Sequence, residues 1–407
     1  MMQKEAYLPP IIDIENLGLD AGAHLLVKYG LRAIPLGSEL RVVGSSPGWE
    51  AQLAAWCRAQ GHGMIMQQQD GRAVATVIRG AADTGRWHDA LHAGHSDAAL
   101  AGAIADQALS SWGLAARGAT VEAGAPDIHF RLDRKDEIWA DTAAVLYAQA
   151  VAAQWNPATA IDWNEPFDLP AAVEDAVAQL MTYLIENETA ALVVPARFLG
   201  QLHPHFREIQ ALLAIQVADE ARHIEVFTRR LRLKGREPAL STAGGQASLK
   251  TLLDESDFSV AGFLLSVLGE GTFVSLLNFL HLHAPDPVTR QIARLTARDE
   301  ARHVAFGMSH LLWRLQQEPQ FRTRLANAVQ SRNDALANTA GLNEEVFDAL
   351  ILIAAGEFTP QAIAAGYVRV QQLIADMAEG RRVRLERLGF DKEAALHLAA
   401  LHTRNFM

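Results

Sequence analysis

The chain has 407 residues, half of them hydrophobic, so it can bury a large core and is too long for one small domain. Its 36 basic and 47 acidic residues give a formal net charge of −11, which disfavours nucleic acid as an electrostatic partner. The single cysteine, Cys57, excludes an internal disulfide and a thiolate metal cluster. Residues 1–5 lack the pattern of a signal peptide, and the most apolar stretch, residues 258–282, is interrupted by polar residues. We therefore expect a cytoplasmic protein without a membrane span.

Residues 1–80 predict a small α/β domain. Apolar runs typical of strands alternate with two helical stretches in the order β-α-β-α-β-β. Asp70-Gly71 separates the last two runs, and Asp-Gly between apolar runs indicates a hairpin. Residues 81–135 are rich in Ala and Gly, and we interpret them as a linker or a small helical region.

Residues 136–407 predict an almost entirely helical domain. Apolar periodicity and helix-ending residues place the helices at residues 136–154, 171–199, 204–232, 258–282 and 287–317, with three further helices after them. The expected fold class is therefore mainly α, with the small α/β domain in front of it.

One pentad, Asp-Glu-Ala-Arg-His, occurs twice, at residues 219–223 and 299–303. In each copy the Glu and the His are three residues apart, so on a helix they project from one face. They are Glu220 with His223, and Glu300 with His303. Two such helices, with one further Glu from each of two other helices, supply the ligand set of di-iron and di-manganese carboxylate bundles.

The two further glutamates are sought on the helices upstream of the pentads. Glu270 lies on an apolar helical face, where an unpaired carboxylate would be strongly destabilising and a metal ion would neutralise it. In the first half Glu186 and Glu188 are both candidates, and Glu188 is preferred because its helical face is more apolar. The predicted ligands are Glu188, Glu220, His223, Glu270, Glu300 and His303.

Four carboxylates carry a charge of −4, which two divalent cations balance, and ligation by oxygen and imidazole favours iron, with manganese as the alternative.

The other pentad residues predict a surrounding hydrogen-bond layer. We expect Asp219 and Asp299 each to accept a hydrogen bond from the His of the opposite helix, and Arg222 and Arg302 to pair with those carboxylates. Trp155, in a loop before the bundle, is interpreted as packing.

The two pentads with their upstream glutamates, over about residues 136–315, resemble the ferritin-like di-iron carboxylate superfamily. They are similar in particular to the hydroxylase subunits of soluble methane and aromatic monooxygenases. The resemblance implies a four-helix bundle with extra helices, a di-iron centre and O₂ activation. The related ribonucleotide reductase subunit has a radical-bearing Tyr close to its metals. Here the Tyr on the four candidate helices, Tyr183, lies off the predicted buried face, which disfavours that role.

The N-terminal domain resembles the TusA-type sulfur carriers, through residues 37–43, 47–50 and 56–62. The Cys-Pro-x-Pro motif that carries sulfur in that family would fall near residues 19–22, where this chain reads Leu-Asp-Ala-Gly. We therefore expect a degenerate domain that binds a partner or covers the bundle.

These patterns lead to the hypothesis of an O₂-dependent di-iron oxidoreductase of the monooxygenase type, which hydroxylates, N-oxygenates or desaturates a small organic substrate. No flavin, dinucleotide-binding or iron–sulfur motif is visible, so electrons must come from an external electron-transfer partner. A homodimer is one expected arrangement. The alternatives are a ferroxidase, or a non-enzymatic, metal-stabilised protein that docks partners through its N-terminal domain.

Overall fold

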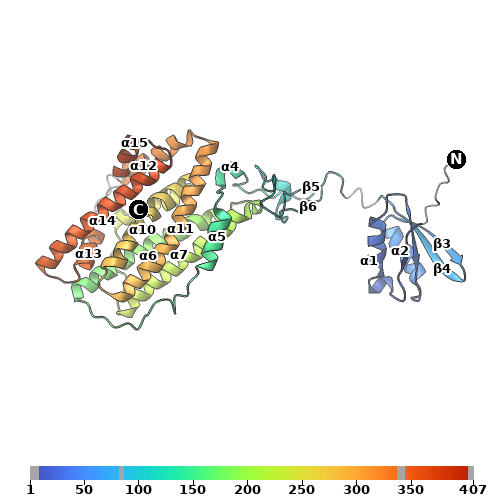
Figure 1. Ribbon diagram of the computed structural model, residues 1–407, viewed down its shortest axis with the longest axis horizontal. Helices are drawn as coiled ribbons and strands as arrows, with labels where there is room; N and C mark the ends of the chain where they lie inside the picture. The colour runs from blue at the N-terminus through green and yellow to red at the C-terminus, as the bar shows by residue number, and fades with distance from the viewer. Residues whose placement is uncertain (1–8, 82–86, 337–343, 402–407) are drawn as a thin grey trace. The chain divides into compact units, whose positions relative to one another are not determined.

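A computed structural model describes residues 9–81, 87–336 and 344–401. The chain forms two compact units, one made of residues 1–96 and 117–127 and the other of residues 97–116 and 128–407. Figure 1 shows the first as a small unit of strands and helices and the second as an assembly of long helices.

The first unit contains a four-stranded mixed sheet in the order β1-β2-β4-β3. Its strands and helices are β1 (Ile11–Asp13), α1 (Ala23–Arg32), β2 (Glu39–Val43), α2 (Trp49–Ala59), β3 (Gly63–Gln69) and β4 (Arg72–Ile78). Strands β1 and β2 pair in parallel, and the other pairs are antiparallel. The predicted β-α-β-α-β-β order is confirmed, and Asp70, with a φ of 52°, turns the predicted hairpin.

The core of this unit lies between the two helices and the sheet. It is built from residues such as Val27, Leu31, Leu53, Leu40, Val42 and Val77. Cys57 belongs to this core, and burial raises the pKa of its thiol to about 11, so the thiol stays protonated at neutral pH. The segment that reads Leu-Asp-Ala-Gly forms a short 3₁₀ turn, Leu19–Ala21, before α1.

The region between the sheet and the bundle has little regular structure. Within its described residues it contains a two-stranded ribbon, β5 (Leu91–His92) with β6 (Thr120–Val121), and a 3₁₀ turn at Ser110–Trp112. The expectation of a linker fits these residues better than that of a small helical region.

The second unit is helical, as its sequence predicted. Its elements are α4 (Lys135–Ile138), α5 (Ala143–Ala152), α6 (Ala171–Leu199), η3 (Pro204–Phe206), α7 (Arg207–Leu233), α8 (Ala243–Asp254), α9 (Phe258–Gly262), η4 (Phe263–Glu270), α10 (Gly271–His283), α11 (Pro287–Gln317), α12 (Phe321–Leu336), α13 (Glu344–Ala355), α14 (Pro360–Arg387) and α15 (Lys392–Ala400).

Three details of the prediction were wrong, the first being that helix α8 was not expected. The single helix expected at residues 136–154 is divided, because Trp139 adopts an extended backbone between α4 and α5. The described C-terminal part contains four helices after α11 where three were expected.

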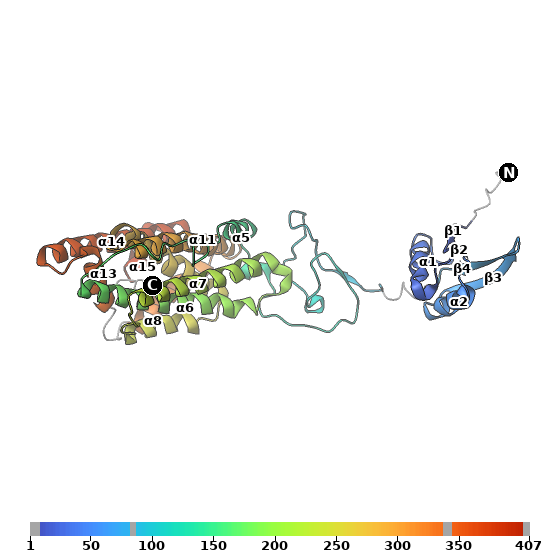
Figure 2. The ribbon, with the colours of Figure 1, turned by 90° about the horizontal axis from the view of Figure 1, so that it is seen from below.

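Four long helical rods form the centre of this unit: α6, α7, the continuous run α9–η4–α10, and α11. Helix α6 packs along α7, and α10 packs along α11 (Figure 1; Figure 2). Helix α5 packs on α7. Helices α8 and α13 both pack on α6, and helix α14 packs on α10. The run Phe258–His283 is long and apolar enough to cross a membrane by composition, but 83% of its most apolar window is buried, as in the core helix of a bundle.

The run α9–η4–α10 is distorted where it meets α11. Residues Phe263–Glu270 form a π-helix, and Gly269 and Gly271 flank Glu270 at its end. Gly307 on α11 faces this segment, and a Cβ atom there would lie 2.7 Å from the Cβ of Ser266. The absence of a side chain at Gly307 therefore allows the two helices to approach closely at the depth of Glu270.

A buried ion cluster fastens the rods at one end. The Arg230 side chain is 0% exposed, and its guanidinium donates hydrogen bonds to Glu174 (2.6 Å) and Asp286 (3.0 Å). Asp286 also caps the N-terminus of α11 by accepting from the Thr289 backbone N–H at 2.7 Å. One cation thus joins α6, α7 and α11.

Replacing this cation tests how much the cluster contributes to stability. Arg230→Leu should lower the free energy of unfolding by about 3–5 kcal/mol, because two buried carboxylates lose their partner. Arg236→Leu removes the more exposed pair with Asp175 and should cost less than about 1 kcal/mol. Urea denaturation measures both, and equal small losses would contradict this account.

Candidate metal centre

The structure brings the six predicted ligand residues together in the middle of the bundle. Glu188 comes from α6, Glu220 and His223 from α7, Glu270 from the end of η4, and Glu300 and His303 from α11. All six are buried, with exposed fractions of 0–4%. Each lies on a helical face that is otherwise largely apolar, so the packing of the rods carries these polar groups inside.

The six side chains form two overlapping groups. One contains Glu188, Glu220, His223 and Glu300, and the other contains Glu220, Glu270, Glu300 and His303. Within each group the ligand atoms lie within 4.8 Å of one another. Glu220 and Glu300 belong to both groups, so their carboxylates are in position to bridge two metal ions.

The atoms that face the centre lack hydrogen-bond partners in the described structure. They are Glu188 Oε1, Glu220 Oε1, Glu270 Oε2, both Oε atoms of Glu300, and His303 Nδ1. A buried polar group without a partner costs about 1–3 kcal/mol, and more when it is charged. Oxygen and imidazole nitrogen are the donors that iron and manganese bind, so these side chains fit a pair of such ions.

The six side chains shift one another's pKa values, because the carboxylates repel one another and attract the imidazoles. Burial and the nearby Glu300 carboxylate raise the pKa of both Glu188 and Glu270 well above its ordinary value. Burial alone would lower the pKa of the two imidazoles. The surrounding carboxylates outweigh burial and raise both pKa values well above the ordinary value; Glu188 acts in this way on His223, and Glu220 on His303. Protons held by these groups would be displaced by metal ions, so metal affinity should rise with pH.

An outer layer orients the two imidazoles. Nε2 of His223 lies 3.2 Å from Asp299 Oδ2, and Nε2 of His303 lies 3.4 Å from Asp219 Oδ2, so each Asp reaches the His of the opposite helix. The Nδ1 atoms consequently face the carboxylates at the centre. An imidazole held in this way presents the correct nitrogen to a metal.

Two arginines complete this layer. Arg222 donates to both aspartates, at 2.9 Å to Asp299, and Arg302 donates to Asp299 and lies 3.7 Å from Asp219. Burial alone would raise the pKa of Asp299, but the hydrogen bond with His223 and those with Arg222 and Trp155 lower it well below its ordinary range.

Three residues in this layer had not been assigned a polar role by the sequence. Trp155, interpreted as packing, donates its indole N–H to Asp299 at 2.8 Å, and the Arg222 guanidinium lies 4.8 Å from its ring centroid. Gln154 donates to Asp219 at 2.8 Å. Gln216 donates to Glu270 at 3.1 Å, and its position one helical turn before Glu220 is a signal that could have identified it.

The structure also separates the alternatives on α6. Glu186 is half-buried and belongs to neither ligand group, whereas Glu188 belongs to one.

Tyr183 was expected off the buried face, but its side chain is buried and its ring centroid lies 5.9 Å from that of Phe273. That expectation was wrong, because helices outside the four-rod bundle also pack on α6 and bury a second face.

A small apolar cavity of about 30 Å³ lies beside Gln216, the hydrogen-bond partner of Glu270. Its walls include Ser266 and Gln216, the second of which donates to Glu270, together with side chains such as Phe198, Leu213, Leu265 and Phe306. At about 10–15 Å³ per water-sized molecule, it holds roughly two such molecules or one diatomic gas molecule.

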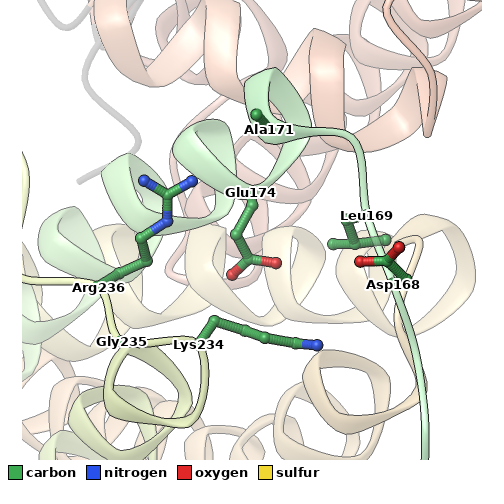
Figure 3. A pocket seen from close by; sticks show the side chains of 7 residues that line it. All are labelled: Asp168, Leu169, Ala171, Glu174, Lys234, Gly235 and Arg236. Atoms are coloured by element: carbon green, nitrogen blue, oxygen red, sulfur yellow. The ribbon is translucent and has the colours of Figure 1, made fainter.

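A larger, polar hollow of about 390 Å³ lies where α6 begins and α7 ends (Figure 3). Three of its charged groups are engaged by the protein itself. Glu174 accepts from Arg230, Lys234 donates to the Phe167 carbonyl at 2.7 Å, and Arg236 pairs with an exposed aspartate. These contacts stabilise the end of the bundle, and none of the six ligand residues lines the hollow.

Several solved structures are similar to this chain. A Synechococcus protein with aldehyde deformylating oxidase activity aligns at 19% identity and a TM-score of 0.42, over 56% of this chain and 96% of its own. The R2-like ligand-binding oxidase of Sulfolobus acidocaldarius aligns at 15% identity and a TM-score of 0.41, over 61% of this chain and 94% of its own.

A variant of an R2-like ligand-binding oxidase with a Mn/Fe cofactor aligns at 16% identity and a TM-score of 0.47, over 62% of this chain and 95% of its own. Another variant in this group carries an Fe/Fe cofactor. No family model matches this sequence, and no curated protein is significantly similar to it.

The outer layer can be tested by removing one charge. Asp299→Asn should lower the affinity for Fe²⁺ or Mn²⁺ about 10–100-fold, because the amide no longer fixes the tautomer of His223. Asp175→Asn, on the surface of α6, serves as the control and should leave the affinity unchanged. Competition with a chelator measures both, and wild-type affinity in Asp299→Asn would contradict the assigned role.

His310 gives a pH dependence beside the cavity. Its Nδ1–H donates to the Trp139 carbonyl (3.0 Å) and its Nε2 accepts from Ser259 (2.8 Å), while burial lowers its pKa from 6.5 to about 4. The unfolded chain therefore binds a proton that the folded chain does not, and stability falls as pH decreases from 6.5 to 4. Protonation of His310 should therefore lower the free energy of unfolding by about 3 kcal/mol between pH 6.5 and pH 4.

The variant His310→Gln should therefore lose less stability between pH 7 and pH 4 than the wild type. Urea denaturation at several pH values gives the difference between the two curves. Parallel curves would mean that His310 is protonated equally easily in both states.

Proposed function

We propose that the chain is a non-haem di-iron oxidoreductase that uses O₂ to hydroxylate, N-oxygenate or desaturate a small organic substrate. Glu188, Glu220, His223, Glu270, Glu300 and His303 are the proposed ligands, with manganese as a possible replacement for iron. Two ferrous ions held by these residues would supply two electrons to O₂, because each ion can pass from +2 to +3. An external electron-transfer partner must then reduce the pair again.

The observation that carries this proposal is the set of buried ligand atoms without hydrogen-bond partners at the centre of the bundle. A structural ion cluster would pair each carboxylate with a cation, as Arg230 does at the end of the bundle. Here four carboxylates face one another, with two imidazoles between them. Without metal ions, this arrangement has to hold protons on buried carboxylates and imidazoles, and two bound cations would replace those protons.

The surroundings favour a redox reaction of an apolar molecule. The cavity beside Gln216 has largely hydrocarbon walls, which suit O₂ and disfavour the passage of hydrated ferrous ions. This is the feature that favours an oxidase over a ferroxidase. The cavity is too small for an organic substrate, so such a substrate must displace side chains along the π-helical segment Phe263–Glu270, whose backbone is already irregular.

The N-terminal unit is proposed to bind a protein partner. Its resemblance to sulfur carriers stays a prediction, and sulfur transfer through Cys57 is disfavoured because the thiol is buried in the core of the unit. Helix α1 exposes Leu25, Leu26 and Tyr29, which supports a role in contacts with other proteins.

The experiment compares two neighbouring glutamates on α6. Anaerobic loading of the full chain with Fe²⁺ should give two irons per chain, and exposure to O₂ should oxidise both. Glu188→Gln should reduce the rate of O₂ consumption on the order of 100-fold, because one iron loses an anionic ligand. Glu186→Gln changes the same functional group two residues away and should behave as the wild type.

Candidate organic substrates are then added with a chemical reductant, and products are analysed by mass spectrometry. Oxygen incorporated from ¹⁸O₂, or a product that has lost two hydrogens, supports the proposed reaction. Iron oxidation without any substrate turnover would favour the ferroxidase, and equal effects of the two glutamate variants would contradict the ligand assignment.

A further inference from the structure

A third and larger cavity, an open cleft, lies on the side of α11 away from the ligand residues. Its volume is about 770 Å³, and it is bounded by α11, α14 and the turn at residues 141–142. This is within the range of about 300–1,000 Å³ that is typical of small-molecule sites. The six ligand residues of the metal centre are not among its lining residues, which all belong to the helical unit.

The cleft has an apolar wall and a basic end. Helix α11 contributes Val304, Met308 and Leu312 to the wall, and the last two turns of α14 contribute Arg384 and Arg387. An elongated molecule with an apolar body and a negative end would match both parts.

Arg384 is held in a slot formed by two glycines. A Cβ atom on Gly271 would lie 2.5 Å from the Arg384 Cζ, and one on Gly380 would lie 3.3 Å from its Nη1. The guanidinium therefore lies directly against the backbone of α10 and α14. Its Nε and Nη2 atoms are buried without a hydrogen-bond partner among the described residues. Gly380, which lies next to Nη1, lines the cleft, whereas Gly271, which lies next to Nε and Nη2, does not.

Positive charge exceeds negative charge around the cleft. Behind Arg384 lies Arg381, which is buried, and both burial and Arg381 lower the pKa of Arg384 to about 10, so Arg384 remains a cation at neutral pH. Lys135 Nζ lies 5.1 Å from the ring centroid of Trp313, which lines the cleft. Asp141 is the acidic lining residue, and it already accepts a hydrogen bond from the indole of Trp139 at 2.9 Å.

We propose that this cleft binds an organic carboxylate, with the carboxylate on Arg384 and Arg387 and the apolar body along Val304, Met308 and Leu312. An arginine presents paired N–H groups to a carboxylate, and both Arg384 and Arg387 line this end of the cleft. A doubly charged phosphate fits less well, because Asp141 lies in the cleft and the chain carries a net charge of −11. The site does not depend on the proposed oxidation.

The test titrates the full chain, with and without bound iron, with 2-naphthoate and with its neutral analogue 2-naphthamide. Isothermal titration calorimetry should give one saturable naphthoate site of the same affinity in both preparations. The amide should bind at least about tenfold more weakly, which corresponds to one lost charge-assisted hydrogen bond. Equal binding of the acid and the amide would overturn the proposal.

Two variants locate the site. Arg384→Gln should weaken naphthoate binding at least about tenfold. Arg382→Gln is the matched control on the same helical turn, and it should leave binding unchanged because Arg382 pairs with Glu379 and Glu386 outside the cleft. Ala305→Trp fills the cleft while keeping both arginines, and it should also weaken binding.

Circular dichroism confirms that each variant is folded, and the Ala305 variant decides the result if Arg384→Gln does not fold. Wild-type affinity in Arg384→Gln or in Ala305→Trp would overturn the proposal. Binding that requires iron and is unaffected by both variants would assign naphthoate to the metal centre and would equally overturn it.

Discussion

The burial of four carboxylates at one point of a helical bundle is the constraint on which the rest of the structure depends. Glu188, Glu220, Glu270 and Glu300 have exposed fractions of at most 3%, and their inner oxygens lack hydrogen-bond partners. A bundle that folded for stability alone would place apolar side chains there. The surrounding layers act on this cluster: the aspartates orient the imidazoles, the arginines hold the aspartates, and Gly307 allows the distorted segment with Glu270 to approach α11.

The parts of this centre that were predictable are those encoded locally. The spacing of Glu and His within each pentad determines a shared helical face, and that needs no knowledge of the fold. The choice of Glu188 over Glu186 followed from the apolar residues on its face, and the structure places Glu188, and not Glu186, in a ligand group. The bounds of α6 and α11 were also predictable, because Pro and Gly mark the ends of strongly periodic segments.

The parts that were not predictable depend on contacts between distant segments. Trp155 donates to Asp299 across 144 positions of sequence, so nothing near Trp155 indicates its partner. The break at Trp139 has the same origin, since the carbonyl of Trp139 accepts from His310, 171 positions away. The cleft beside Arg384 was invisible for a similar reason: Gly271, Gly380 and Arg384 form one slot only when α14 packs on α10.

The most direct test of the central claim is a crystal structure of the full chain grown with Fe²⁺ under anaerobic conditions, with anomalous diffraction measured at the iron edge. The account predicts two anomalous peaks inside the bundle, one near His223 and one near His303, with Glu220 and Glu300 between them. A single peak would contradict the bridged pair, and no peak among these residues in an otherwise folded bundle would contradict the metal centre itself.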